Sequence, residues 1–396
     1  MTSALAIDGG DPVRSTVLPY GRQWIDDDDI SAVVDVLRSD WLTTGPKVSE
    51  FEEAFAEYVG AKYAVAVSSG TAALHASAFA CGLREGDEVI TTPLTFAASA
   101  NCVLYQQGTP VFADVRPDTL NLDPEQVRKK ITPRTKAIIP VDYTGQPADM
   151  DAINAIAADH GLMVIEDASH APGAKYKERR VGTLADMTVF SLHPVKHLTT
   201  GEGGVVTTDD SRLAQQLRMF RNHGLSSDAK ERQEKGVFFY EMVELGYNYR
   251  LTDIQCALGL SQLGKVDRWL DRRREIAAHY SDVLGPMPEL QLPAVRPDCE
   301  PAWHLFVVLL NLEELRVGRN EVFQALRAEN IGVNVHYVPV PWHPYYQNLG
   351  YQRGNWPVAE DAYERMLSLP MFPTIDDKDI DDVFEALKKV VAAYRK

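Results

Sequence analysis

One lysine, Lys196, lies in a short polar turn between two stretches that have the composition of buried strands. Residues 187–192 precede the turn, and a Gly-Glu-Gly-Gly sequence at 201–204 leads into the second stretch, 205–208. Burying an ammonium group is costly, and a desolvated lysine amine becomes a nucleophile that can form a Schiff base. The alternative is an ordinary lysine that faces water, and only the neighbouring residues can decide between the two.

Polar residues that could bind a phosphorylated ring follow other expected strands. Ser69, Gly70 and Thr71 lie where a strand passes into a helix, so free N–H groups and the helix dipole could bind a phosphate there. Asp167 ends a strand and could pair with a protonated ring nitrogen. Taken alone, the first group is more typical of a helix N-cap, and Asp167 is more typical of a turn or an N-cap.

Three further side chains extend this set. Phe96 could stack on a ring, His170 could hydrogen-bond to the same ligand, and Ser191 could give a hydroxyl to the phosphate. Singly, Phe96 is typical of a core residue and His170 of a half-buried histidine. An amine, a carboxylate, a stacking aromatic and a phosphate cup are together the groups that pyridoxal phosphate requires. We therefore predict that Asp167 keeps the ring nitrogen protonated, and that Lys196 binds the aldehyde and moves the proton.

Alternating strands and helices must position these residues. Apolar runs at 63–67, 88–91, 110–113, 136–141 and 162–165 alternate with helical patterns such as 70–81, 95–107 and 150–160. This alternation predicts an α/β fold with a mostly parallel sheet and helices on both faces, in which ligands bind at the carboxyl ends of the strands.

The chain divides into three predicted parts. An extended arm covers residues 1–26, a large α/β domain covers 27–269, and a smaller α+β domain covers 270–396. A long helical pattern at 252–284 leads into the smaller domain, which has expected strands near 304–310 and 333–338 and expected helices near 320–329 and 379–394.

The composition excludes several classes of function. The net charge of −16 argues against a nucleic-acid surface. The four cysteines have neither metal-binding spacing nor a disulfide pattern. No signal peptide and no membrane-length apolar run is recognised, so we expect a cytoplasmic protein without a membrane partner and without a metal.

Over nearly its whole length, the chain resembles the DegT/StrS-type nucleotide-sugar aminotransferases, which are fold-type-I pyridoxal-phosphate enzymes. The stretches that carry the resemblance are 69–74, 166–170, 190–196, 201–204, 221–224 and 246–253. The resemblance implies a seven-stranded sheet and a homodimer with shared active sites. It also implies that Lys196 forms the Schiff base, that Asp167 contacts the pyridinium nitrogen, and that His170 contacts the phenolic oxygen.

The resemblance implies further contacts. Phe96 would stack on the ring, the phosphate would be held by Ser69, Gly70, Thr71 and Ser191, and Asn248 of the partner subunit would reach it with Arg250 nearby. Position 169 is Ser where relatives commonly have Ala, and position 192 is Leu where Phe is common. We expect neither difference to touch the chemistry.

The expected reaction moves the amino group of L-glutamate to a nucleotide-linked 4-keto sugar. Residues 41–47, 302–305 and 332–340 are most similar to the pseudaminic-acid-pathway members, which implies UDP-4-keto-6-deoxy-N-acetyl-L-altrosamine as the substrate. UDP-4-keto-arabinose and dTDP-4-keto-6-deoxyhexoses remain alternatives. Candidate substrate contacts are Thr44, Arg221, His223, Arg250, His336 and Tyr337.

Two other classes compete with an aminotransferase. A fold-type-I lyase or cysteine desulfurase is one, but a desulfurase needs a mobile, reactive cysteine, and none of the four cysteines lies in a glycine-rich loop near the predicted site. A pyridoxal-phosphate-binding regulator without turnover is the other. Retention of both Lys196 and Asp167 favours an enzyme.

Overall fold

The computed structural model describes residues 4–227, 232 and 236–396. Its centre is a seven-stranded sheet of order β1-β9-β8-β5-β4-β2-β3, in which only β9 runs antiparallel to its neighbours. The mostly parallel α/β fold predicted from the sequence is confirmed. The strands are β1 (Tyr63–Val67), β2 (Glu88–Thr91), β3 (Thr109–Phe112), β4 (Thr135–Ile139), β5 (Met163–Asp167), β6 (Lys175–Tyr176), β7 (Arg179–Arg180), β8 (Met187–Ser191), β9 (Gly204–Thr208), β10 (Leu290–Gln291), β11 (Cys299–Glu300), β12 (Phe306–Leu310) and β13 (Met366–Leu369).

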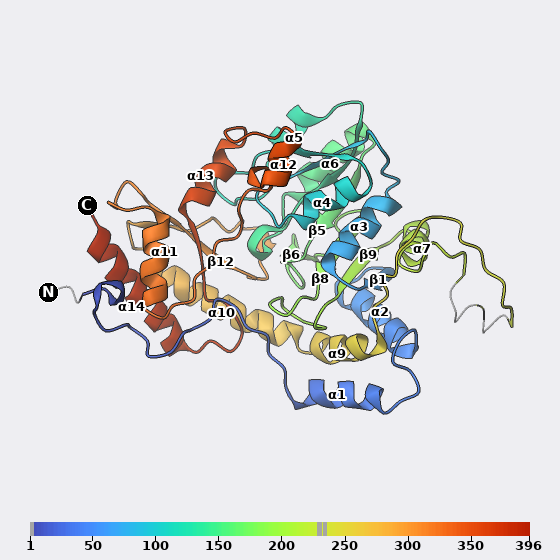
Figure 1. Ribbon diagram of the computed structural model, residues 1–396, viewed down its shortest axis with the longest axis horizontal. Helices are drawn as coiled ribbons and strands as arrows, with labels where there is room; N and C mark the ends of the chain where they lie inside the picture. The colour runs from blue at the N-terminus through green and yellow to red at the C-terminus, as the bar shows by residue number, and fades with distance from the viewer. Residues whose placement is uncertain (1–3, 228–231, 233–235) are drawn as a thin grey trace.

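Helices cover both faces of this sheet and build the end of the molecule that carries both termini (Figure 1). The α-helices are α1 (Asp27–Leu37), α2 (Pro46–Val59), α3 (Gly70–Ala80), α4 (Ala98–Tyr105), α5 (Pro124–Lys130), α6 (Met150–His160), α7 (Ser211–Phe220), α9 (Asp253–Leu263), α10 (Val266–Leu284), α11 (Arg319–Ala328), α12 (Pro344–Asn348), α13 (Pro357–Arg365) and α14 (Asp377–Tyr394). Short 3₁₀ helices are η1 (Ala6–Asp8), η2 (Tyr143–Gly145) and η3 (Val340–Trp342).

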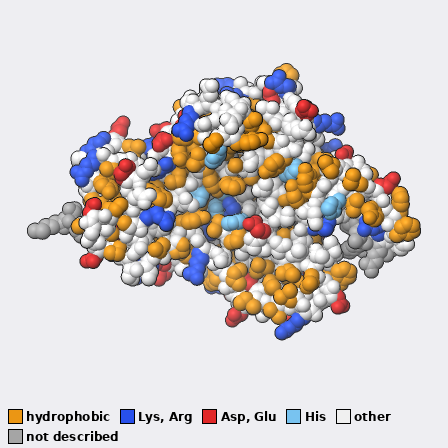
Figure 2. Space-filling model, in the orientation of Figure 1, with side chains coloured by type: hydrophobic (Ala, Val, Ile, Leu, Met, Phe, Trp, Pro, Cys, Tyr) orange, Lys and Arg blue, Asp and Glu red, His pale blue; other side chains and the backbone are white. Residues whose placement is uncertain are grey.

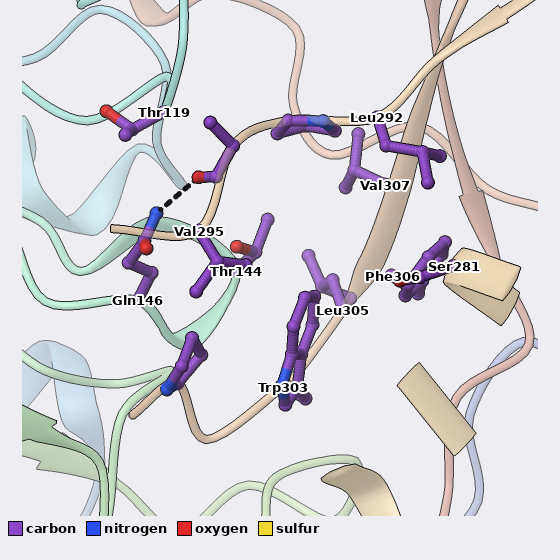
Figure 3. A pocket seen from close by; sticks show the side chains of 13 residues that line it. Thr119, Thr144, Gln146, Ser281, Leu292, Val295, Trp303, Leu305, Phe306 and Val307 are labelled. Carbon is purple, nitrogen blue, oxygen red and sulfur yellow. Dashed lines mark hydrogen bonds between the residues drawn. The ribbon is translucent and has the colours of Figure 1, made fainter. Parts of the chain in front are cut away.

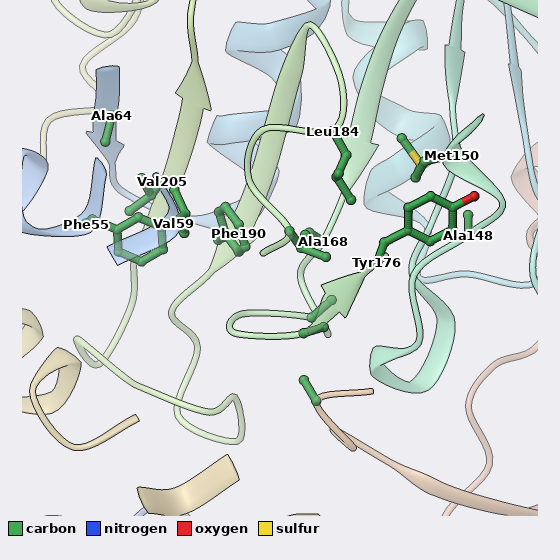
Figure 4. Packing of buried hydrophobic residues seen from close by; sticks show 14 of the residues in the cluster. Phe55, Val59, Ala64, Ala148, Met150, Ala168, Tyr176, Leu184, Phe190 and Val205 are labelled. Atoms are coloured by element: carbon green, nitrogen blue, oxygen red, sulfur yellow. The ribbon is translucent and has the colours of Figure 1, made fainter. Parts of the chain in front are cut away.

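The sheet is apolar on both faces because alternate strand residues enter two different cores. Ala64 and Ala66 of β1 join the core that includes residues of α2, α6 and α10, whereas Val65 and Val67 join the core that includes residues of α3 and α7. Figure 4 shows the first of these cores, with Phe55 and Phe190 side by side at a ring-centroid distance of 5.1 Å. Burial on both faces explains why the strands read as continuous apolar runs.

The smaller part of the molecule has its own core around β12, α11 and α14. Leu5 and Leu18 of the N-terminal arm are buried in this core, so the arm packs against the C-terminal part of the chain. Helix α10 contributes Trp269 and Leu270 to the large core and Ile276 and Tyr280 to the small one. The domain boundary that we predicted at residue 270 falls inside this helix and stays a prediction.

Three sequence-based element assignments were wrong in detail. The pattern at 252–284 is two helices, because the chain breaks at Gly264 and Lys265, where the lysine pairs with Asp26 and Asp29. Residues 333–338 do not form a strand; Asn334 makes a single bridge to Ser368, and the 3₁₀ helix η3 begins soon after, at Val340. Helix α4 begins at Ala98, after a turn that contains Phe96.

Candidate active site

The predicted site residues lie at one edge of the sheet because parallel strands end together. Strand β1 is followed by Ser69, β5 ends at Asp167, β8 ends at Ser191, and the antiparallel β9 begins at Gly204 on the same side. On the face shown in Figure 2, several histidine side chains gather near the middle, where the surface is hollowed.

The turn that carries Lys196 is closed by backbone and hydroxyl contacts. The N–H of Leu192 donates to the carbonyl of Gly203 at 2.9 Å, and the carbonyl of Leu192 accepts from the N–H of Thr200 and the hydroxyl of Thr199, both at 3.1 Å. The turn is therefore a fixed platform, and its lysine is held in one region of space.

Lys196 is partly buried and forms no ion pair among the residues that the structure describes. Burial lowers the pKa of Lys196 to about 8, although the negative charge of Asp167 acts in the opposite direction. The Nζ atom lies 3.4 Å from Nε2 of His304. The amine thus releases its proton more easily than an ordinary lysine, as a nucleophile or base must.

Asp167 is buried and its carboxylate is held by two hydroxyl groups. Ser99 of α4 donates to Oδ2 at 2.7 Å, and Ser169 donates to Oδ1 at 2.6 Å through its hydroxyl and at 3.2 Å through its N–H. The hydroxyl of Ser169, which we expected not to touch the chemistry, thus binds the predicted partner of the ring nitrogen. Leu192, the other departure from the family pattern, is a buried core residue.

The N-terminus of α3 is built to receive an anion. The side chain of Ser69 accepts from the N–H of Ala72 at 3.0 Å and caps the helix. The N–H groups of Gly70 and Thr71 have no acceptor within the described part of the chain. A Cβ atom on Gly70 would lie 3.0 Å from the Cβ of Ser191, and one on Gly204 would lie 2.4 Å from the carbonyl oxygen of Ser69. Glycines therefore keep this cup narrow, with the Ser191 hydroxyl at its wall.

Aromatic residues close the other side of the site. His170 is buried, and its Nε2 lies 3.0 Å from the hydroxyl of Tyr337, while its Nδ1 has no hydrogen-bond partner. The ring of Phe96 lies 6.0 Å from that of Tyr337, and its side chain is 61% exposed. A large exposed phenylalanine beside a buried histidine with an unused nitrogen leaves apolar and polar surface for a ring-shaped ligand.

The substrate candidates fall into two groups. His336 and Tyr337 lie beside the site, where Nδ1 of His336 is 2.8 Å from the hydroxyl of Ser368. Thr44 is exposed in a loop whose next residue, Gly45, donates its N–H to Asp253 at 2.7 Å. These contacts with substrate stay predictions.

The second group lies near the end of β1 and the end of α7. Arg221 pairs with Glu52 and donates to the carbonyl of Ala66 at 2.6 Å, so its guanidinium is already occupied by protein groups. The substrate contact that we predicted for Arg221 therefore has no support from its position. His223 is exposed, and Nη1 of Arg250 donates to Asn222 at 2.7 Å.

The residues present fit pyridoxal phosphate. The unfilled amides of the α3 cup suit a phosphate, and Asp167 offers a carboxylate to a ring nitrogen. Asp167 affects the pKa of Lys196 but is not within ion-pair distance of it, so a ligand can lie between the amine and the carboxylate. Sequence reasoning did not assign Ser99 or His304 to the site. Nothing in its own segment marks Ser99, and the stretch 302–305 that contains His304 was used only as an indication of the substrate.

Comparisons with known proteins agree with this site. Residues 23–388 match the model of the DegT/DnrJ/EryC1/StrS aminotransferase family. The chain is 46% identical over 381 residues to the spore coat polysaccharide biosynthesis protein SpsC of Bacillus subtilis, covering 96% of this chain and 98% of SpsC.

Solved structures show the same fold over the whole chain. PseC of Helicobacter pylori, an aminotransferase involved in the biosynthesis of pseudoaminic acid, is 32% identical with a TM-score of 0.89, covering 96% of this chain and 100% of PseC. Spr1654 of Streptococcus pneumoniae, solved in a PLP-form, is 30% identical with a TM-score of 0.89, covering 95% of this chain and 99% of that one. The chain therefore belongs to the DegT/DnrJ/EryC1/StrS aminotransferase family and is a pyridoxal-phosphate-dependent sugar aminotransferase.

Proposed function

We propose that the protein transfers the amino group of L-glutamate to the C4 keto group of a nucleotide-linked 4-keto-6-deoxy sugar. The products are 2-oxoglutarate and the 4-amino sugar nucleotide. The observation that carries this proposal is the Lys196 amine, which lies between buried strands with a pKa lowered to about 8 and without a carboxylate partner among the described residues. Bound pyridoxal phosphate supplies an aldehyde that combines with amines and a ring that takes up the electrons of a breaking C–H bond.

The residues of the site divide the work between binding and proton transfer. The amides of Gly70 and Thr71 and the hydroxyl of Ser191 would hold the phosphate group. Asp167, whose carboxylate accepts hydrogen bonds from two hydroxyl groups, would hold the proton on the ring nitrogen. The free Nζ of Lys196 would take the proton from the carbon that bears the donor's amino group and deliver it on the other side of the reaction.

For the sugar, we propose UDP-4-keto-6-deoxy-N-acetyl-L-altrosamine. The similarity to PseC, whose name places it in pseudoaminic acid biosynthesis, supports this choice. SpsC acts in spore coat polysaccharide biosynthesis by its name, which supports a cell-surface sugar more generally. UDP-4-keto-arabinose and dTDP-4-keto-6-deoxyhexoses are the competing substrates that an assay must include.

We also propose that the enzyme is a homodimer with shared sites. Residues 237–247 carry a row of exposed apolar side chains that includes Phe238, Phe239, Met242 and Leu245, with Phe238 90% exposed. A surface of this kind needs a cover, and a second copy of the chain is the occupant that the family suggests. Asn248 follows directly and is exposed, so the same contact would carry it toward the site of the partner.

The visible absorption of the purified protein with pyridoxal phosphate tests the proposal. We expect a yellow band that bleaches with L-glutamate and returns when the correct 4-keto sugar nucleotide is added, with the amino sugar detected by mass spectrometry. Adding the three candidate sugars separately identifies the substrate.

Two variants make this assay specific. Lys196→Ala should abolish turnover, whereas Lys62→Ala, which changes an exposed lysine next to β1, should leave it unchanged. A band that ignores glutamate would contradict the proposed donor. Binding of the cofactor without turnover on any of the sugars would favour the regulator instead.

A further inference from the structure

We propose that His304 is a positioning residue, which holds the amine of Lys196 by accepting its hydrogen bond at Nε2, and that Arg273 fixes His304 for this task. The proposal rests on Lys196 being the reactive lysine. His304 lies two residues before the start of β12, so it reaches the site from the smaller core rather than from the sheet edge. Its Nε2 atom, 3.4 Å from Nζ, is the hydrogen-bonding group that contacts the amine.

The surroundings of His304 determine the direction of this hydrogen bond. The ring is buried, and burial together with the charges of Lys196 and Arg273 and the neighbouring rings of His170 and His197 lowers the pKa of His304 well below its usual value. The imidazole is therefore neutral and carries one proton. An ammonium group can only donate, so the nitrogen that faces it accepts and the ring proton lies on Nδ1.

Packing keeps the imidazole in one orientation. The rings of His304 and His170 lie 4.4 Å apart, and those of His304 and His197 lie 5.6 Å apart. His197 in turn is tied to the same segment, since its Nε2 lies 2.8 Å from the carbonyl oxygen of Ala302. These neighbours pack against the imidazole, whose Nε2 is the nitrogen that contacts Lys196.

Arg273 of α10 fixes the backbone of this segment. Its side chain is fully buried, and Nη1 donates to the carbonyls of Trp303 at 2.9 Å, His304 at 3.3 Å and Met371 at 3.2 Å. It makes no ion pair with any carboxylate in the described ranges, and burial lowers its pKa to about 9. Burying a cation without a counter-ion is costly. The hydrogen bonds that Arg273 donates to these three carbonyls offset this cost.

The segment that carries His304 has an unusual backbone conformation beside a cavity. Trp303 borders a cavity of about 60 Å³ between the two cores, together with Thr144, Gln146 and Leu292 (Figure 3). Trp303 also has a φ of +52°, which a residue with a side chain rarely adopts. Backbone bonds from Ala302 to Gly145 at 2.9 Å and from Leu305 to Thr144 at 3.2 Å flank this conformation, and the guanidinium of Arg273 binds the two carbonyls between them.

The hydrogen bond to His304 restrains the side chain of Lys196 whenever the amine is not bound to the cofactor. A flexible four-carbon side chain would otherwise sample many positions. An acceptor at a fixed place keeps Nζ inside the site, and it also stabilises the ammonium form relative to the amine. Removing the acceptor should therefore lower the pKa of Lys196 and raise the fraction of reactive amine below that pKa.

The test is the labelling of Lys196 in the apoenzyme by an amine-reactive acylating reagent, followed by peptide mass spectrometry as a function of pH. His304→Phe keeps a ring but loses the acceptor, and we expect labelling at pH 7 to become about fivefold faster, as for the loss of about 1 kcal/mol of hydrogen bonding. His304→Gln restores an acceptor and should stay within about twofold of the wild type. His160→Phe, at an exposed site at the end of α6, is the matched control.

Equal labelling in the Phe and Gln variants would overturn the proposal, because the ring would then only fill space. A second measurement needs no variant: ¹⁵N spectra of histidine-labelled apoenzyme should place the His304 proton on Nδ1, and a proton on Nε2 would refute the assignment. The proposed function is tested separately by borohydride reduction of the protein with pyridoxal phosphate. If the reduced cofactor is attached to a residue other than Lys196, the proposed function fails whatever the state of His304.

Discussion

Replacing Lys196 by methionine should stabilise the apoprotein at neutral pH. Burial lowers the pKa of Lys196 from 10.5 to about 8, which means that the folded protein disfavours the ammonium form. The difference of about 2.5 pH units corresponds to about 3 kcal/mol at about 1.4 kcal/mol per unit. Because the side chain is partly exposed, we expect Lys196→Met to raise the free energy of unfolding by about 1–3 kcal/mol at pH 7.

The pH dependence gives the sign of the effect. Below pH 8 the amine is protonated in both the folded and the unfolded protein, so the wild type carries the full penalty. Between pH 8 and about 10.5 the unfolded chain binds more protons than the folded one, and the stability of the wild type rises relative to the variant. The difference between the two proteins should therefore shrink with rising pH and be nearly gone at about pH 10.5.

Urea denaturation of the two apoproteins, followed by tryptophan fluorescence at pH 7 and pH 10, measures this difference. Lys62→Met is the matched control, because Lys62 is exposed and its replacement should leave the unfolding midpoint unchanged. A Lys196→Met protein that is no more stable than the wild type at pH 7 would refute the reasoning. So would a stability difference that does not fall as the pH rises.

Three further predictions concern the rest of the site. Asp167→Asn should bind the cofactor and stay coloured but slow the glutamate half-reaction by about 100-fold or more, since an amide cannot hold the ring-nitrogen proton; near-normal single-turnover rates would contradict this role. Gly204→Ala should weaken cofactor binding at least about tenfold, because the added Cβ would lie 2.4 Å from the carbonyl oxygen of Ser69. Gly264→Ala is the control and should bind the cofactor normally in the same titration, because its Cβ would meet only a carbonyl oxygen at 3.7 Å. Mixing inactive Lys196→Ala and Asn248→Asp chains, after dissociation and reassembly, should restore about one quarter of the activity, since half of the random dimers would have one intact site of two; no recovery despite confirmed heterodimers would refute the shared site.

The strands of the sheet and the helices between them were largely predictable, because a strand that is buried on both faces is a continuous apolar run in the sequence. Continuous apolar runs such as β4 and β8 are recognisable without any knowledge of their neighbours, and Gly60 and Asp149 mark helix ends through their own backbone and side-chain preferences. The stretch at 333–338 has the same kind of apolar alternation but is not a strand. The carbonyl of His336 accepts from the hydroxyl of Tyr143, and β13 pairs with β12 instead.

Some residues of the site can be recognised from their own stretch of sequence, whereas others join it only through contacts that the fold creates. Lys196, Asp167 and the α3 cup were predictable, because each follows a strand and parallel strands end at one edge. Ser99 and His304 were not. Nothing in its own segment distinguishes Ser99 from other polar residues, and the stretch 302–305 gave no indication that His304 contacts the lysine. Folding places Ser99 next to the carboxylate of Asp167 and His304 next to the amine of Lys196, and only these contacts make the two residues part of the site.

This division has a consequence for the reaction. The residues found from sequence are those that could bind the cofactor, whereas Ser99, Ser169 and His304 contact Asp167 and Lys196 and hold their charged groups in place. Ser99 belongs to a helix that packs on the sheet, but His304 is fixed by Arg273 of α10, a helix that joins both cores. A displacement of the smaller core relative to the sheet would therefore move the acceptor away from the Lys196 amine while leaving Asp167 in place. The geometry of proton transfer thus depends on how the two cores are joined, and α10 is the element through which a distant substitution would reach the lysine.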